Sequence, residues 1–277
     1  MADRQHEWQD ADVATNGIRV HYWRTGGDKP PLVLLHGITD NGLCWRRVAA
    51  VLADDYDLIM VDGRGHGESD KPDRYRLDDY AADTAGLIEA LALGKPGVMG
   101  HSLGAAIGAT LTASRPDLVR CLALEDPPWR QPASPATEEA RREHMQTWRA
   151  ETVERKATMS HAEIVAAGKA RSTTWHADEF DPWAQAKLDV SEHVFDNVGA
   201  GLAEWRTFAS QIKCPTLLVG GDSELGAIVT PDIAQEAATL NPRITFTLLA
   251  DAGHNVRREQ FDAFLAAVQP FLAQHMS

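Results

Sequence analysis

The five residues Gly100-His101-Ser102-Leu103-Gly104 form a pattern that can turn a serine hydroxyl into a nucleophile. They follow the short apolar run GVM and precede a segment with helical spacing. A tight strand-to-helix turn forces its middle residue into strained backbone angles, and the flanking glycines avoid a clash with a Cβ atom. The turn lifts the hydroxyl clear of the sheet at a helix N-terminus, whose dipole stabilises developing negative charge. Ser102 is the predicted nucleophile.

A serine hydroxyl needs a base to accept its proton. His254 lies in the segment Asp251-Ala252-Gly253-His254-Asn255, which follows the last strand-like run of the chain. The carboxyl ends of parallel strands meet at one edge of a sheet, so we expect His254 at the same edge as Ser102. His254 is the predicted general base.

An oxyanion hole requires two backbone N–H groups that point at one position. Leu103, directly after the nucleophile, supplies the first. The loop His36-Gly37-Ile38-Thr39 follows the first long strand-like run, and we predict the Ile38 N–H as the second donor. A further glycine-rich segment, 62–69, has no helix directly after it and no Lys-Ser/Thr pair, which excludes a phosphate-binding loop.

Short, continuously apolar runs alternate along the chain with segments of helical spacing. Such runs are typical of strands that are buried on both faces, and the alternation predicts an α/β fold with a mostly parallel sheet flanked by helices. An earlier pair of strands around Asn16-Gly17 predicts a hairpin. The predicted parallel strands are 31–35, 58–61, 97–99, 121–124, 216–219 and 245–249, and the predicted helices are 77–91, 105–114, 231–240 and 260–273.

The alternation stops between Pro127 and Trp205. Helical segments are predicted there at 137–159, 162–171 and 182–197. We expect a helical cap over residues 128–205, inserted into a core formed by residues 1–127 and 206–277. Because ligand sites are mostly apolar, we expect the cap to cover a hydrophobic pocket. The candidate substrate-binding residues are Trp129, Trp183, Trp175 and Met145.

The segments LLHGITDN, VDGRGHGESD, GHSLG and AGHNVRREQ occur in this order, and with them the chain resembles the α/β-hydrolase superfamily over essentially its full length. It resembles the serine esterase and lactonase-like branch with a helical cap. The resemblance implies an eight-stranded, mostly parallel sheet with a cap inserted after the sixth strand. A serine at the turn disfavours the haloalkane dehalogenase and epoxide hydrolase branches, which use a carboxylate nucleophile.

The acidic partner of His254 departs from the common pattern of this superfamily. Most members place an Asp after the seventh strand, where this chain has Glu224 in the usual slot and Asp222 two residues earlier. Glu125 instead ends the apolar sixth strand, and a buried carboxylate requires a partner. Some branches, including a macrolactone hydrolase, carry the catalytic Glu there. We favour Glu125 and keep Asp222 and Glu224 as alternatives, while Asp126 resembles a structural Asp that many members have before a proline.

Composition limits the classes of partner. The chain has 277 residues, and 27 Lys and Arg against 40 Asp and Glu give a formal charge of −13, which disfavours nucleic-acid binding. Three widely spaced cysteines build neither a disulfide framework nor a metal knuckle. The first ten residues lack the features of a secretory signal, and no apolar run approaches the ~20 residues of a membrane span. We expect a cytoplasmic monomer or homodimer without cofactor or metal.

These observations predict a serine hydrolase that cleaves a carboxylic ester or lactone of a hydrophobic or aromatic small-molecule substrate through an acyl-enzyme. Two alternatives remain, because a fold does not decide its chemistry. A C–C bond hydrolase of ring-cleavage products would use the same side chains. A ligand-sensing protein on the same fold would keep them and turn over slowly.

Overall fold

The computed structural model describes residues 8–196 and 202–276. Residues 1–7, which belong to the stretch predicted to hold no secretory signal, and Asn197, the predicted end of a helix, lie outside the described residues. Eight strands form a single sheet in the order β1-β2-β4-β3-β5-β6-β7-β8. The strands are β1 (Gln9–Thr15), β2 (Ile18–Arg24), β3 (Pro31–Leu35), β4 (Asp57–Val61), β5 (Gly97–His101), β6 (Leu122–Glu125), β7 (Thr216–Gly220) and β8 (Ile244–Leu248).

The sheet is parallel from β4 to β8, and only β1 and β2 run antiparallel to their neighbours. The predicted mostly parallel, eight-stranded sheet is therefore confirmed. The predicted hairpin is also present, because Asn16 and Gly17 both have positive φ (46° and 78°), as a primed two-residue turn requires.

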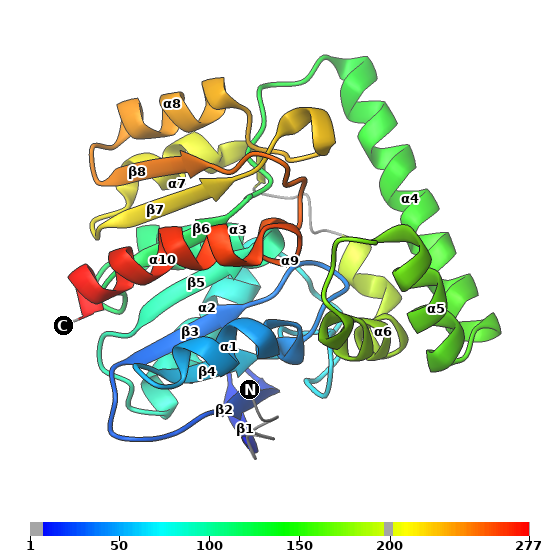
Figure 1. The fold of residues 1–277 in the computed structure, drawn as a ribbon, viewed down its shortest axis with the longest axis horizontal. Helices are drawn as coiled ribbons and strands as arrows, with labels where there is room; N and C mark the ends of the chain where they lie inside the picture. The colour runs from blue at the N-terminus through cyan, green and yellow to red at the C-terminus, as the bar shows by residue number, and fades with distance from the viewer. Residues whose placement is uncertain (1–7, 197–201, 277) are drawn as a thin grey trace.

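Helices cover both faces of the sheet (Figure 1). Those on one face pack around the cluster that includes Val48, Leu52 and Phe264, and those on the other around the cluster that includes Leu87 and Leu111. The first face carries α1 (Arg46–Leu52) and α10 (Phe261–Met276), and the second carries α2 (Leu77–Ala90), α3 (Leu103–Ser114), α7 (Trp205–Gln211) and α8 (Pro231–Leu240).

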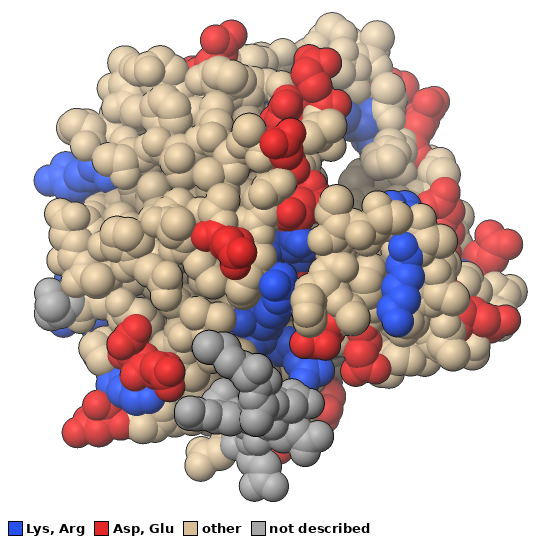
Figure 2. Space-filling model, in the orientation of Figure 1, with Lys and Arg blue, Asp and Glu red and all other residues tan. Residues whose placement is uncertain are grey.

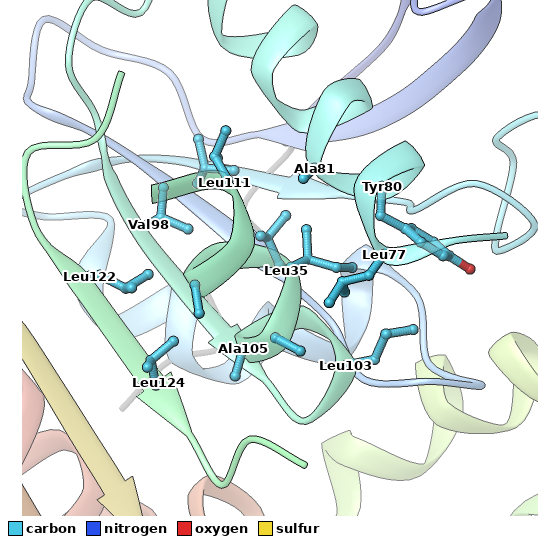
Figure 3. Packing of buried hydrophobic residues seen from close by; sticks show 14 of the residues in the cluster. Leu35, Leu77, Tyr80, Ala81, Val98, Leu103, Ala105, Leu111, Leu122 and Leu124 are labelled. Carbon is cyan, nitrogen blue, oxygen red and sulfur yellow. The ribbon is translucent and has the colours of Figure 1, made fainter. Parts of the chain in front are cut away.

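Side chains of the central strands are buried on both faces. On β3, Val33 and Leu35 join the cluster under α2 and α3, whereas Leu32 and Leu34 join the cluster under α1 and α10. Figure 3 shows Leu35 beside Leu103 and Ala105 of α3, between β5 and α2. Burial on both faces explains why these strands read as unbroken apolar runs.

Among the described residues between β6 and β7, three α-helices lie wholly within the range predicted for the cap: α4 (Pro135–Thr158), α5 (His161–Arg171) and α6 (Phe180–Asp189). They stand beside the sheet in Figure 1. The predicted helix 182–197 is too long, because the chain leaves helical geometry at Val190 and Ser191 caps the short 3-10 helix η3 (Glu192–Phe195). Division of the chain into a core and a cap stays a prediction.

Within the described residues, no helix is both long and apolar enough to span a bilayer.

Two glycines allow α3 to lie close to the sheet. A Cβ at Gly104 would overlap the main-chain carbonyl of Leu35, and a Cβ at Gly100 would overlap the main chain of Gly104. Four residues further along α3, a Cβ at Gly108 would meet only side-chain methyl groups, those of Leu122 at 3.0 Å and Val98 at 3.4 Å. The backbone of α3 is thus fixed against β3 at its first turn.

We predict that Gly104→Ala lowers the free energy of unfolding by about 1–3 kcal/mol, because main-chain atoms cannot move aside for the added methyl group. The matched change Gly108→Ala should cost much less, since side chains can adjust and alanine favours the helix by about 1 kcal/mol over glycine. Urea denaturation midpoints measure both effects. Equal midpoints for the two variants would contradict the close approach described for Gly104.

Candidate active site

Ser102 occupies the sharp turn between β5 and α3. Its φ of 52° and ψ of −115° are outside the helical region, although it directly precedes the helix. A non-glycine residue in such a conformation is strained, and strain of this kind is common at functional sites. The Ser102 N–H donates to the Glu125 carbonyl at 2.9 Å, which fixes the turn to the end of β6.

A chain of two contacts joins three side chains at this edge of the sheet. Ser102 Oγ lies 3.0 Å from His254 Nε2. His254 Nδ1 lies 2.6 Å from Asp126 Oδ2. The three side chains therefore stand in the order that proton transfer from a serine would require.

The register of β5 and β6 explains why Asp126 reaches this position. His101 pairs with Glu125, so Ser102 and Asp126 are the next residue on each of the two adjacent strands. Both leave the sheet with positive φ, 52° and 41°. The two residues turn out of the sheet at the same level, and His254 contacts both.

Asp126 is fully buried, and its carboxylate is held by backbone donors as well as by His254. The N–H of Ile228 donates to Oδ2 at 2.8 Å, and the N–H of Val229 donates to Oδ1 at 2.9 Å. These two residues precede α8, in the loop after β7. In most members of the α/β-hydrolase superfamily the loop after β7 carries the acidic residue itself. In this chain the same loop donates hydrogen bonds to Asp126.

Glu125 does not contact His254, contrary to the expectation from the sequence. Its Oε1 accepts the N–H of Arg257, and its Oε2 accepts from the Arg257 guanidinium at 2.9 Å. Glu125 is the last residue of β6 and pairs with Arg257, whereas Asp126 follows the strand with a φ of 41° and turns its carboxylate toward His254. At this strand end the carboxylate that contacts His254 is that of Asp126, one position after Glu125.

The two alternative acids also stay away from His254. Asp222 caps the 3-10 helix η5 (Ser223–Leu225), because its Oδ1 accepts the N–H of Glu224 at 2.8 Å. Glu224 itself is exposed. Hydrogen bonding within the loop accounts for Asp222, and the described contacts give Glu224 no part in the site.

The predicted oxyanion donors lie on either side of Ser102. Leu103 is the first residue of α3, where a backbone N–H has no acceptor within the helix. A Cβ at Gly37 would stand 3.4 Å from the Ser102 Cβ, so the loop with Ile38 runs directly beside the nucleophile. Thr39 in this loop has a φ of 64°. The use of both N–H groups as donors stays a prediction.

His101 supports the base through the backbone. Its Nε2 lies 3.0 Å from the carbonyl oxygen of His254, which can only accept. Burial, together with the nearby Arg257 charge, lowers the pKa of His101 well below its ordinary value. His101 is thus neutral near pH 7 and donates from Nε2, which fixes the main chain that carries the His254 ring.

The four candidate substrate-binding residues of the inserted segment do not form one cluster. Trp129 is buried in the main core and stacks on Trp205 at a centroid distance of 5.0 Å, and Met145 packs against the same core. Trp183 and Trp175 belong to a separate cluster and meet edge to face at 6.1 Å. Contact of each with substrate stays a prediction.

Sequence reasoning missed a set of buried charged side chains around the site. Three are cations and three are carboxylates, and every one is no more than 7% exposed. The sequence feature that could have revealed this set is the pair Arg257-Arg258, directly after the His254 loop. Two guanidinium groups require acidic partners if they are buried. The set is Lys187, Arg257 and Arg258 with Asp40, Glu125 and Glu179.

Metal chemistry has no ready site in the portion of the chain that the structure covers. No group of three or more His, Cys, Asp or Glu side chains there is placed to hold a metal ion.

The family model described as "alpha/beta hydrolase fold" matches residues 30–257 of this chain. The chain is also similar to 2-(acetamidomethylene)succinate hydrolase of Mesorhizobium japonicum, with 45% identity over 104 residues. That match spans 37% of this chain and 37% of the relative. A match of nearly full length, 94% of this chain and 95% of the relative, links it at 29% identity to N-formylmaleamate deformylase of Pseudomonas putida.

The crystal structure of E-2-(acetamidomethylene)succinate hydrolase resembles this structure with a TM-score of 0.80. The two chains are 26% identical, and the superposition covers 96% of this chain and 100% of the other. The similarity therefore extends over both the sheet and the inserted helices.

We predict that Asp126→Asn reduces turnover about 10⁴-fold, because the amide no longer stabilises the protonated imidazole or fixes its tautomer. Steady-state kinetics on any substrate that the wild type cleaves measure this loss. Glu125→Gln tests the neighbouring carboxylate and Asp222→Asn is the control in the loop after β7. A larger loss in either of these than in Asp126→Asn would refute the assignment of Asp126.

Proposed function

This chain belongs to the alpha/beta hydrolase fold family, and we propose that it is a hydrolase that uses Ser102 to cleave an N-acyl bond in a small anionic substrate. The observation that supports the chemistry is the chain of contacts from Ser102 through His254 to Asp126, at 3.0 Å and 2.6 Å. The observation that supports the substrate class is the similarity to two enzymes whose named substrates carry an N-acyl group and carboxylates.

The mechanism follows from this arrangement. His254 Nε2 takes the proton of Ser102 as Oγ attacks the acyl carbon, and Asp126 stabilises the imidazolium through Nδ1. The N–H groups of Leu103 and Ile38 stabilise the oxyanion of the tetrahedral intermediate. His254 then protonates the departing nitrogen, and an acyl-serine remains. Water, deprotonated by His254, hydrolyses this ester and restores Ser102.

The kind of bond is the point on which the comparisons and the sequence prediction diverge. The alternative predicted from the sequence is a C–C bond hydrolase, and the names of the relatives favour a C–C bond or an amide bond over the predicted ester or lactone. The amide bond was not among the sequence predictions. An amide fits both names, since acetamido and formyl-amide groups each contain an acyl–nitrogen bond. Ser102, activated by His254 and Asp126, can attack the carbonyl carbon in each of these groups.

Arg130 is the residue that we propose for recognition of a substrate carboxylate. It follows Asp126 by four residues, and no described side chain forms a hydrogen bond or ion pair with its guanidinium. Arg130 is an exposed residue; partial desolvation lowers its pKa, and the charge of Arg141 lowers the pKa further, while Asp126 opposes this effect. An anion bound here would pair with a cation that the protein leaves without a carboxylate.

We predict that the purified protein cleaves 2-(acetamidomethylene)succinate or N-formylmaleamate with a higher kcat/KM than p-nitrophenyl esters, a lactone or a dienone ring-cleavage product. Ser102→Ala should abolish turnover and keep the fold, because only the nucleophilic oxygen is removed. Ser114→Ala, at the far end of α3, is the matched control and should retain full activity.

Three outcomes would overturn the proposal. Higher kcat/KM on the esters or the lactone would support the ester or lactone hydrolase predicted from the sequence. Higher kcat/KM on the dienone ring-cleavage product would support the C–C bond hydrolase. Turnover below about one per minute on every substrate, against typical rates near ~10 s⁻¹, would favour a ligand-sensing protein.

We predict that Arg130→Met raises KM for the anionic substrates about 10- to 100-fold, because a hydrogen bond to a charged group contributes about 1.5–3 kcal/mol. The KM of a neutral ester should change little. Arg115→Met, which removes a cation already paired with Glu89 and Asp117, is the control. An equal rise in KM for neutral and anionic substrates would contradict carboxylate recognition by Arg130.

A further inference from the structure

Lys187 reaches from α6 into the loop that follows β3. Its ammonium group donates to the Thr39 carbonyl at 2.6 Å, to Thr39 Oγ1 at 2.9 Å and to Asp40 Oδ1 at 3.1 Å. The three donors of a lysine are thereby all used. The side chain is buried, and Trp183 of the same helix lies under the ammonium at 5.0 Å. Such a buried cation is costly unless it is fully paired, as this one is.

The acceptors of Lys187 belong to the predicted oxyanion loop. Thr39 follows Ile38, and its φ of 64° is strained for a β-branched residue. The turn is closed by a hydrogen bond from the Asp40 N–H to the Gly37 carbonyl at 3.1 Å. Lys187 binds the strained residue at both its carbonyl and its hydroxyl, so the inserted helix holds Thr39 and the Thr39–Asp40 peptide in place, directly after Ile38.

Asp40 extends the same attachment to the His254 loop. Its Oδ2 pairs with Arg258 at 3.1 Å and lies 3.6 Å from Arg257. Burial alone would raise the pKa of Asp40, but Arg258, Lys187 and Arg257 outweigh it and hold the pKa well below its ordinary value. One carboxylate thus joins the oxyanion loop, the inserted helix and the loop that carries the base.

The inserted segment makes a second ionic contact with the same group. Arg258 pairs with Glu179 at 3.1 Å and stacks on Trp175 at 4.5 Å. On the face shown in Figure 2, basic side chains gather at the boundary between the sheet core and the inserted helices. Loss of Lys187 would leave Asp40 with two cations, so the rest of the cluster would stay paired.

We propose that Lys187 is a positioning residue for the oxyanion hole, so that the site is complete only when α6 is seated on the Thr39 loop. The inference rests on the proposed function, since it concerns stabilisation of the same tetrahedral intermediate. Lys187 does not touch the substrate. It fixes the strained backbone at Thr39, and this backbone sets the direction of the Ile38 N–H.

The test compares Lys187→Met, which keeps the length of the side chain and removes its donors, with Thr39→Val, which removes one acceptor and keeps the shape. Arg171→Met is the matched control, because Arg171 lies over the same Trp183 ring at 5.8 Å and has no described contact with the loop. Readouts are kcat, KM and the affinity for a trifluoromethyl ketone, whose adduct with Ser102 places an oxyanion in the hole.

For Lys187→Met we expect kcat and trifluoromethyl ketone affinity to fall together by about 10- to 100-fold, less than the 10²–10³ lost with an outright donor. KM should stay within about twofold, and Thr39→Val should show a smaller fall of the same kind. A folded Lys187→Met protein with unchanged kcat and ketone affinity would overturn the proposal. So would an equal loss of affinity for reaction product and ketone, since that would reflect general damage to the pocket.

Thr39→Val keeps the proposal testable if Lys187→Met does not fold, because a variant with wild-type kcat and ketone affinity would then count against it. Failure of the proposed function would give a different experimental result from failure of the Lys187 proposal. A wild-type protein that neither turns over substrate nor forms the ketone adduct contradicts the Ser102 mechanism itself, whatever the variants do.

Discussion

The pairing of β5 with β6 is the constraint on which the site depends. Because His101 lies opposite Glu125, the next residues, Ser102 and Asp126, leave the sheet at the same level. A shift by one residue would bring Glu125 to that level and turn its side chain to the opposite face. The close approach of α3 to β3 at Gly104 holds Ser102 in this register. The geometry of the proposed site is therefore a property of the central sheet, and the loops complete it.

Charge balance is the second organising feature. Three cations and three carboxylates are buried next to the site, and they belong to segments far apart in the sequence. Removal of one partner from a buried ion pair strongly lowers the stability of the fold. The intact pair, however, adds little net stability compared with apolar residues packed in its place. The cluster is thus better suited to fixing positions than to raising stability. Asp40 is its centre, since all three cations lie within 4 Å of its oxygens.

The sequence predicts most of the fold and part of the site. The unbroken apolar strands follow from burial on both faces. The strand-to-helix turn at residues 100–104 follows from the spacing of its two glycines, so both features can be derived from local patterns. The acid could not be derived in this way. Glu125 and Asp126 are adjacent carboxylates at one strand end, and only the strand register and the presence of Arg257 separate their roles. Similarly, Lys187 gives no local signal, because its partner Thr39 is 148 residues away.

Among the carboxylates described near the site, Asp126 is the one that contacts the imidazole facing Ser102. One-dimensional proton NMR of the protein in water can detect this contact, through the Nδ1–H resonance of His254 downfield of the amide region. We expect this resonance in the wild type and in a Glu125→Gln variant, and we expect it to be lost when Asp126 becomes Asn. Persistence of the resonance in the Asp126 variant, with loss in the Glu125 variant, would show that Glu125 holds the imidazole instead.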